Sequence, residues 1–176
     1  MKGYLVRWSM LGLLFSAAPA ALAVKVGDPV PDLAVAGTGG SSVNLRNGDG
    51  WRVVFFYPKA FTPGCNAQAC GMRDSFQAYL DRGVTVFGVS TDSLKTQQEF
   101  KEKHNLPYEL LADADKELSR AFNVLMPLVG WPKRTTFIIN PEGIVTDIID
   151  AVNVGSHDAD VLRLLDVRVG ETDSGT

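Results

Sequence analysis

Residues 53–65 read VVFFYPKAFTPGC, an apolar run followed by a loop that leads into a cysteine. The first five residues have the length and composition of a buried strand. Thr62 is a good N-cap and Pro63 a good first helical residue, so we expect a helix over residues 63–80. Cys65 then lies at the helix N-terminus, where backbone N–H groups and the helix dipole stabilise a thiolate. This stretch therefore predicts a strand, a loop and a helix that presents a reactive thiol.

The rest of the chain extends this unit into a sheet. Residues 84–90 (VTVFGVS) read as a second buried strand, and the helix between the two strands makes them parallel in a βαβ unit. Strands over 135–139 and 144–152 flank the turn sequence NPEG and should pair as an antiparallel hairpin. The other expected elements are a hairpin over 33–45, a helix from Ser93 to about His104, a strand at 110–112, and helices over 115–122 and about 157–165. This order predicts an α/β fold of one domain, a thioredoxin-like sandwich whose mixed central β-sheet is flanked by helices and carries an N-terminal β-hairpin extension.

The first 23 residues have the pattern of a secretory signal peptide. Lys2 and Arg7 precede an apolar stretch, and the small-residue sequence Ala21-Leu22-Ala23 follows it. We expect cleavage after Ala23, export and a periplasmic location. A membrane anchor is the alternative reading, but about ten apolar residues are too few to span a bilayer. The mature chain would then be a domain over 24–170 and a polar tail over 171–176.

Charge and composition exclude several kinds of partner. The chain has 176 residues and a formal net charge of −3, which becomes −5 when Lys2 and Arg7 are removed with the signal peptide. A mildly acidic domain without a basic cluster is a poor ligand for nucleic acid or for an anionic membrane. The two histidines, His104 and His157, are expected at the surface. The spacing of His and Cys gathers no metal ligands, so we expect neither a metal nor a cofactor.

Two cysteines, Cys65 and Cys70, lie five positions apart. In an exported protein such a pair is by default a structural disulfide. Residues five apart in an ideal helix have Cα atoms about 8–9 Å apart, beyond the roughly 7 Å limit for a disulfide. The bond requires the first turns of the helix to unwind. We therefore interpret the pair as a redox-active dithiol, with a static cross-link as one alternative.

The motif Pro58-x-x-x-Thr62-x-x-Cys65 resembles the active-site signature of peroxiredoxins, in the AhpC/TSA superfamily. With Cys70 and Arg73-Asp74 added, the run is similar to the bacterioferritin comigratory protein, or Q-type, subfamily, whose resolving cysteine lies five residues after the peroxidatic one. The similarity continues through residues 88–92 and 134–139 and covers nearly all of the mature chain. It implies a thiol-dependent peroxidase that reduces hydrogen peroxide and organic hydroperoxides in antioxidant defence.

The resemblance also implies a role for each residue of the motif. Cys65 would attack the peroxide as a thiolate and become a sulfenic acid, and Cys70 would condense with it to a disulfide that a thioredoxin-like protein reduces. Thr62 would hydrogen-bond the thiolate and the substrate, and Pro58 would shield the thiol from water. The remaining implied site residues are Arg134, which would stabilise the thiolate and the leaving oxygen, and Gly64, whose amide would hold the peroxide. Lys133 is the neighbour with which Arg134 could be confused. Phe61 is a further candidate for substrate binding, as a residue of the pocket wall.

Four positions depart from the subfamily pattern. Asn66 and Gln68 stand where Thr and Glu are usual, and the loss of a carboxylate should favour ionisation of the thiol. Ala60 and Phe61 stand where acidic or polar residues are common, so the mouth of the site is more apolar. This composition predicts a preference for organic hydroperoxides.

Other functional classes remain as alternatives. A thioredoxin-fold thiol–disulfide oxidoreductase would have Cys-x-x-Cys at the helix start, whereas four residues separate the two cysteines in this chain. A non-catalytic domain with a structural disulfide is the third possibility. Because relatives of the Q type occur as monomers and as dimers, we expect a monomer or a weak dimer.

Overall fold

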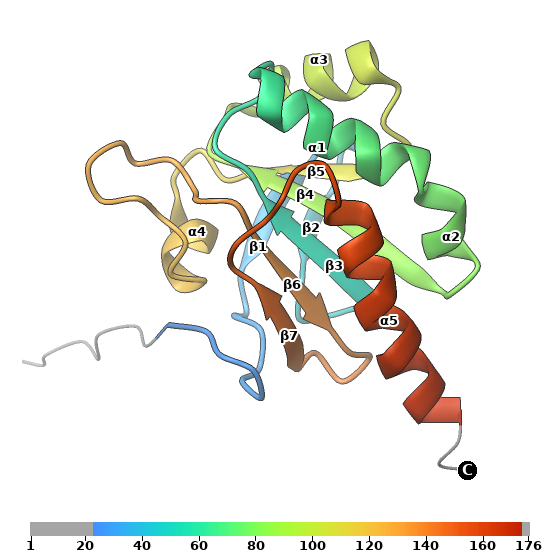
Figure 1. Cartoon of the computed structure of the whole chain (residues 1–176). Coiled ribbons are helices and arrows are strands. Elements are labelled where there is room, and N and C mark those ends of the chain that lie inside the picture. Colours follow the sequence, from blue (N-terminus) through green and yellow to red (C-terminus); the bar gives the residue numbers. More distant parts are fainter. Residues whose placement is uncertain (1–22, 174–176) are drawn as a thin grey trace, which may run out of the picture.

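Seven strands form one mixed sheet in the computed structural model, which describes residues 23–173 (Figure 1). Their order across the sheet is β2-β1-β5-β4-β3-β6-β7. The central strands β5, β4 and β3 are parallel, and the other neighbouring pairs are antiparallel. The strands are β1 (Ala34–Gly37), β2 (Ser42–Asn44), β3 (Trp51–Phe56), β4 (Val84–Ser90), β5 (Glu109–Ala112), β6 (Thr135–Ile139) and β7 (Val145–Ile149). The predicted α/β class, the mixed sheet and the N-terminal hairpin at its edge are confirmed.

Helices cover both faces of this sheet (Figure 1). They are α1 (Pro63–Asp74), α2 (Phe76–Leu80), α3 (Leu94–His104), α4 (Glu117–Ala121) and α5 (His157–Asp173). On strand β3, Val53 and Phe55 face a core that includes residues of α1, α2, α3 and α5. Val54 and Phe56 face a second core, which includes residues of α4. Strand β3 is thus buried on both faces, which explains why its sequence is a continuous apolar run.

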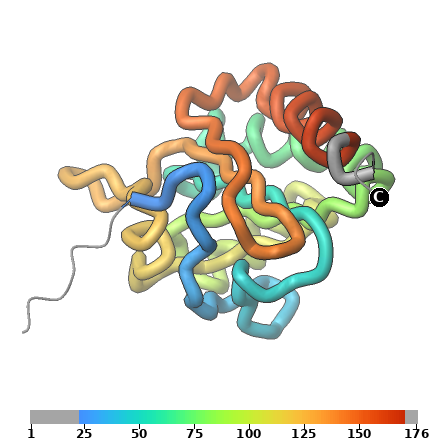
Figure 2. The backbone as a smooth tube through the Cα atoms, turned by 90° about the horizontal axis from the view of Figure 1, so that it is seen from below, coloured from blue at the N-terminus to red at the C-terminus, as the bar shows by residue number. Residues whose placement is uncertain are grey.

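The chain before β1 lies against the turn that joins β6 to β7 (Figure 2). The amide of Gly27 donates to Val145 O at 2.8 Å, and the amide of Val30 donates to Gly143 O at 2.9 Å. The turn sequence predicted at 140–143 closes the hairpin, and Asn140 Oδ1 accepts a hydrogen bond from the amide of Ile144 at 2.8 Å. These contacts tie the N-terminal segment to the edge of the sheet that carries β7.

The helix expected over residues 63–80 is interrupted, so that part of the prediction is wrong. Ser75 has φ −93° and ψ 7°, and these angles end α1 before α2 begins. Its hydroxyl donates to Asp158 Oδ2 at 2.6 Å, which ties the break to the first turn of α5. The helical segment that carries both cysteines is therefore α1 alone.

Other boundaries also differ from the predictions. Helix α5 continues to Asp173 because residues beyond its expected end, such as Val169, pack against the core. The first residues of the predicted tail are therefore helical, and residues 174–176 lie outside the described residues. Helix α4 begins at Glu117, because the buried carboxylate of Asp113 accepts hydrogen bonds from the amides of its first turn. Strand β7 is shorter than expected and ends at Ile149.

The predicted signal peptide falls on residues 1–23, of which only Ala23 is among the described residues. Within residues 23–173, no helix is long and apolar enough to cross a membrane.

Candidate active site

The site begins where strand β3 passes through a tight loop into helix α1. Phe61 has a φ of 64°, a left-handed conformation that is costly for a residue with a side chain. Thr62 follows in an extended conformation and is the N-cap, and Pro63 opens the helix, as predicted. The Thr62 hydroxyl donates to Lys59 O at 3.0 Å, and it makes no hydrogen bond to the helix. The loop therefore turns sharply and directs Cys65 into the core.

Cys65 is buried, with 1 % of its surface exposed, and it contacts the guanidinium of Arg134. Arg134 Nη1 lies 3.2 Å from Cys65 Sγ. The contact depends on sheet pairing, because Phe56 at the end of β3 is opposite Thr135 at the start of β6. Lys133, the neighbour of Arg134, instead forms an ion pair with Asp150 at 3.0 Å. A guanidinium beside a sulfur at a helix N-terminus is an environment that stabilises a thiolate.

Two further residues of α1 shape the position of Arg134. The Oε1 atom of buried Gln68 accepts a hydrogen bond from Arg134 Nη1 at 2.9 Å. A Cβ atom built on Gly64 would lie 2.7 Å from Arg134 Nη2. Gly64 is therefore the residue that allows the guanidinium to approach the helix start. Gln68 holds it there without adding a negative charge beside Cys65.

A buried polar network anchors the loop before Cys65. Asp92 Oδ2 accepts hydrogen bonds from the amide of Ala60 and from Ser90 Oγ, both at 2.8 Å. Gln97 Nε2 donates to Ser90 Oγ at 2.9 Å, and Tyr57 OH donates to Gln97 Oε1. Sequence reasoning missed Gln97, because an amide on a charged helix has the pattern of a solvent-exposed residue. Ser90 and Asp92 lie within residues 88–92, a stretch that the family resemblance includes.

The rim of the site is apolar and carries two lysines. Phe61 is 38 % exposed, and its ring packs edge-on against Phe100 at a centroid distance of 5.2 Å. Lys103 Nζ lies 5.4 Å from the centroid of the Phe61 ring. Lys59 Nζ, in the same loop as Phe61, lies 5.3 Å from the centroid of the Trp131 ring, and Trp131 is 40 % exposed. Pro58 is half-buried in the same loop.

The second cysteine, Cys70, lies on the same helix and is half-buried. Both cysteines are free thiols in this wound helix. Cys70 Sγ lies 3.7 Å from Nδ1 of His104, which is half-buried, so the residue expected only at the surface also contacts the second thiol. A single histidine near a helix end offers no sequence signal for such a contact.

His157 is not at the surface, in contrast to the prediction. It is 2 % exposed, and its Nε2 lies 2.7 Å from Thr136 Oγ1. Burial lowers the pKa of His157 to about 4. The ring packs edge-on against Phe55 and belongs to the core beneath the site.

The residues described by the structure contain no group of three or more His, Cys, Asp or Glu side chains placed to hold a metal ion.

Comparison with known proteins agrees with this geometry. The model of the AhpC/TSA family matches residues 26–148. Peroxiredoxin Bcp of Bacillus subtilis (strain 168) is 37 % identical over an alignment of 151 residues that covers 82 % of this chain and 96 % of that protein. Peroxiredoxin Bcp of Escherichia coli (strain K12) is 36 % identical over an alignment of 149 residues that covers 81 % of this chain and 96 % of that protein.

Solved structures show the same similarity. Peroxiredoxin Q of Xanthomonas campestris superposes with a TM-score of 0.76 and 31 % identity over 83 % of this chain and 97 % of its own. A second structure, of the bacterioferritin comigratory protein of Xanthomonas campestris studied for its alkyl peroxide reduction activity, has a TM-score of 0.76 and 31 % identity over 83 % of this chain and 98 % of its own. The chain therefore belongs to the AhpC/TSA family and is a relative of the peroxiredoxins Bcp and PrxQ.

Proposed function

We propose that this chain is a thiol-dependent peroxidase in which Cys65 is the peroxidatic cysteine. The observation that carries the proposal is the position of Cys65 Sγ, which lies at the start of α1 and 3.2 Å from Arg134 Nη1. The Cys65 thiolate attacks the terminal oxygen of the peroxide, the O–O bond breaks, and the other oxygen leaves with a proton as water or an alcohol. Cys65 becomes a sulfenic acid.

The residues around Cys65 provide the stabilisation that this step needs. The amides of Gly64 and Cys65 belong to the first helical turn, whose N–H groups have no partner within the helix, and they favour negative charge near the helix start. Arg134 stabilises the thiolate and the charge that develops on the leaving oxygen. We assign Thr62 to hydrogen bonding of the substrate, since its hydroxyl can turn from Lys59 O towards the site. Pro58 and Phe61 limit the access of water.

Cys70 is the proposed resolving cysteine. It condenses with the Cys65 sulfenic acid, releasing water, and a thioredoxin-like protein reduces the resulting disulfide. Because both cysteines lie on the continuous helix α1, the turns between them must unwind for the bond to form. The catalytic cycle therefore alternates between a wound reduced helix and an unwound oxidised one.

One assay tests these roles. Purified wild-type protein, Cys65→Ser and Cys70→Ser are compared for peroxide consumption with a dithiol reductant. We expect Cys65→Ser to have no turnover. We expect Cys70→Ser to reduce one equivalent of peroxide and then to depend on an external thiol. Equal activity of the three proteins would contradict a peroxidase function.

The apolar rim supports a preference for organic hydroperoxides. Phe61, in the loop that leads to Cys65, and Trp131, which contacts Lys59 of the same loop, both present exposed aromatic surface. Rate constants for cumene hydroperoxide and hydrogen peroxide are compared in wild type and Phe61→Ser. The preference predicts that the substitution slows cumene hydroperoxide more than hydrogen peroxide. A clear wild-type advantage for hydrogen peroxide would exclude it.

We also propose that the chain is exported to the periplasm, that residues 1–23 are its cleaved signal peptide, and that the mature protein is a monomer or weak dimer. The support is the charged start, the apolar stretch and the Ala21-Leu22-Ala23 sequence. Mass spectrometry of the protein from the periplasmic fraction should find Val24 as the first residue. An unprocessed chain in the cytoplasmic fraction would contradict the proposal.

A further inference from the structure

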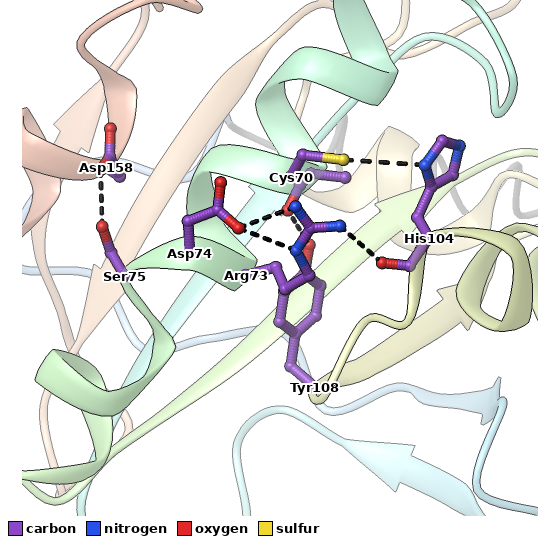
Figure 3. A network of polar contacts seen from close by, with 8 residues as sticks. Cys70, Arg73, Asp74, Ser75, His104, Tyr108 and Asp158 are labelled. Atoms are coloured by element: carbon purple, nitrogen blue, oxygen red, sulfur yellow. Dashed lines mark hydrogen bonds and ion pairs between the residues drawn. The ribbon is translucent and has the colours of Figure 1, made fainter.

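The thiol of Cys70 has a defined partner in the wound helix (Figure 3). Its Sγ lies 3.7 Å from Nδ1 of His104, the last residue of α3. Figure 3 shows the sulfur and the imidazole facing each other across the gap between α1 and α3. This separation is within hydrogen-bonding range for sulfur, so one proton can be shared between the two groups.

The imidazole of His104 is held in place by its neighbours. Arg73 Nη1 donates to the backbone oxygen of His104 at 2.9 Å, which ties α1 to the end of α3 (Figure 3). The ring packs edge-on against Phe100 at a centroid distance of 4.9 Å. Its other nitrogen, Nε2, is buried without a hydrogen-bond partner among the described residues. Cys70 is therefore the polar side chain towards which the ring is directed.

The charges around His104 favour a neutral ring. Burial is the main cause that lowers its pKa, and the positive charges of Lys103 and Arg73 act in the same direction. The Arg73 charge is offset in part by its ion pair with Asp74 at 2.7 Å. Tyr108 packs nearby and donates its hydroxyl hydrogen to Ala69 O at 2.7 Å. A neutral imidazole has one unprotonated nitrogen, and such a nitrogen at Nδ1 accepts the thiol proton.

We propose that His104 is a catalytic residue of the disulfide-forming step, in which it acts as the general base for Cys70. In the wound helix the Cys70 thiol hydrogen-bonds to the neutral His104 ring at Nδ1, and the ring takes up the thiol proton only as the turns unwind and the sulfur begins its attack. When the turns unwind, the Cys70 thiolate attacks Sγ of the Cys65 sulfenic acid, so that the S–S bond forms and the S–O bond breaks. The hydroxide leaves as water after taking a proton, and His104 releases its own proton to solvent. No other oxidant is needed, because the sulfenic acid is reduced as Cys70 is oxidised.

This inference rests on the proposed peroxidase function, and a single-turnover experiment separates the two. Reduced protein is mixed with one equivalent of peroxide, and acid-quenched samples are analysed by mass spectrometry for sulfenic acid and disulfide. In His104→Gln we expect sulfenic acid to form within twofold of the wild-type rate. We expect the conversion to disulfide to slow about tenfold at pH 7, since an ordinary cysteine is only a few per cent thiolate there.

The pH profile distinguishes a base from a structural support. In His104→Gln the disulfide step should accelerate steadily as pH rises above about 7, because only solvent can then take the thiol proton, whereas the wild-type rate should change little over the same range. Glu102→Gln, an exposed change on the same turn of α3, is the matched control and should behave as wild type. If His104→Gln does not fold, the wild-type profile still tests the inference, because the disulfide step must slow as pH falls through the titration of His104.

Three outcomes have different meanings. If wild-type protein forms no sulfenic acid, the proposed function fails. If sulfenic acid forms and His104→Gln makes disulfide at the wild-type rate with the wild-type pH profile, only the role of His104 is overturned. Equal slowing of both steps in His104→Gln would also overturn it, because that pattern indicates a general disturbance of the site.

Discussion

Arg134 reaches Cys65 because residue 64 has no side chain. A Cβ at Gly64 would lie 2.7 Å from Arg134 Nη2, so Gly64→Ala must push the guanidinium away from the helix start. A hydrogen bond to a charged group contributes about 1.5–3 kcal/mol, and each 1.36 kcal/mol is about tenfold in rate. We therefore expect Gly64→Ala to lower the second-order rate constant with peroxide about tenfold or more, measured by stopped-flow fluorescence.

Gly71→Ala is the matched control for this prediction. It lies on the same helix, and an added Cβ would be 3.8 Å from Asp158 Oδ1, an ordinary contact. Alanine also has a better helix propensity than glycine, so the control should keep full activity and equal or higher stability. If both variants react with peroxide at the same rate, the prediction is wrong, and Gly64 is not needed for the close approach of Arg134 to Cys65.

The loop between β3 and α1 is held in a costly conformation by a contact from the end of β4. Phe61 has a φ of 64°, and the neighbouring amide of Ala60 donates to Asp92 Oδ2. In Asp92→Ala this bond is lost, and we expect the loop to relax and to expose the Ala60 amide. Native-state hydrogen exchange should show faster exchange at residues 60–62, and the peroxidase rate should fall severalfold. Thr91→Ala is the control, and equal exchange in both variants would contradict the anchoring role.

A buried hydrogen bond holds helix α1 at a residue between its two cysteines, and we call this bond the tether. Tyr108 OH donates to Ala69 O at 2.7 Å, in the segment that unwinds when the disulfide forms. Tyr108→Phe removes a hydrogen bond worth about 1 kcal/mol. This bond exists only in the reduced state, in which helix α1 is wound. The reduced state then loses stability relative to the disulfide, so the reduction potential of the Cys65–Cys70 pair should become about 20 mV more negative. Equilibration with dithiothreitol redox buffers measures this potential.

Tyr79→Phe serves as the control for the tether. Its hydroxyl lies 3.3 Å from Asp158 O and 3.3 Å from Met72 Sδ, outside the segment between the cysteines. We expect lower stability in this variant with an unchanged potential. A shift of equal size in both variants would show that general loosening, and not the tether to Ala69, sets the redox equilibrium.

At the scale of the whole molecule, the sequence predicted those strands and helix ends that depend on local sequence patterns. The apolar run of β3, the Pro63 start of α1 and the Ser93 cap of α3 were read correctly because each is coded within a few residues. The break at Ser75 was missed, because it depends on a hydrogen bond to Asp158, which is distant in sequence.

The candidate site shows the same division between local and distant contacts. The sequence singled out Cys65 by its place at the start of a helix and paired it with Cys70 by their spacing, whereas the role of Arg134 came from the resemblance alone. The antiparallel pairing of β3 with β6 brings that arginine to Cys65, and no local pattern encodes it. The burial of His157 and the contact of His104 with Cys70 were not predicted, since an isolated histidine has no periodicity that indicates its partners.

Burial of His157 makes the stability of the whole molecule depend on pH. Its ordinary pKa of 6.5 is lowered to about 4 by burial, which outweighs the opposite effect of Asp158 and Asp160. Above pH 6.5 the ring is neutral in the folded and in the unfolded chain, so it does not make the free energy of unfolding depend on pH. Between pH 6.5 and about 4 the unfolded chain binds a proton that the folded chain excludes, so the free energy of unfolding falls as pH falls. The loss is about 3 kcal/mol over this range, at about 1.36 kcal/mol per pH unit.

His157→Gln tests this effect, because glutamine can still bond the Thr136 hydroxyl but does not titrate. The variant is expected to be less stable than wild type at pH 7.5. Its free energy of unfolding, measured by urea denaturation from pH 7.5 to 4, should decline less steeply. Carboxylates titrate in both proteins, so the difference between the two curves isolates the ring. Parallel curves would show that His157 takes up its proton in the folded protein as readily as in the unfolded chain, and that burial does not control its charge.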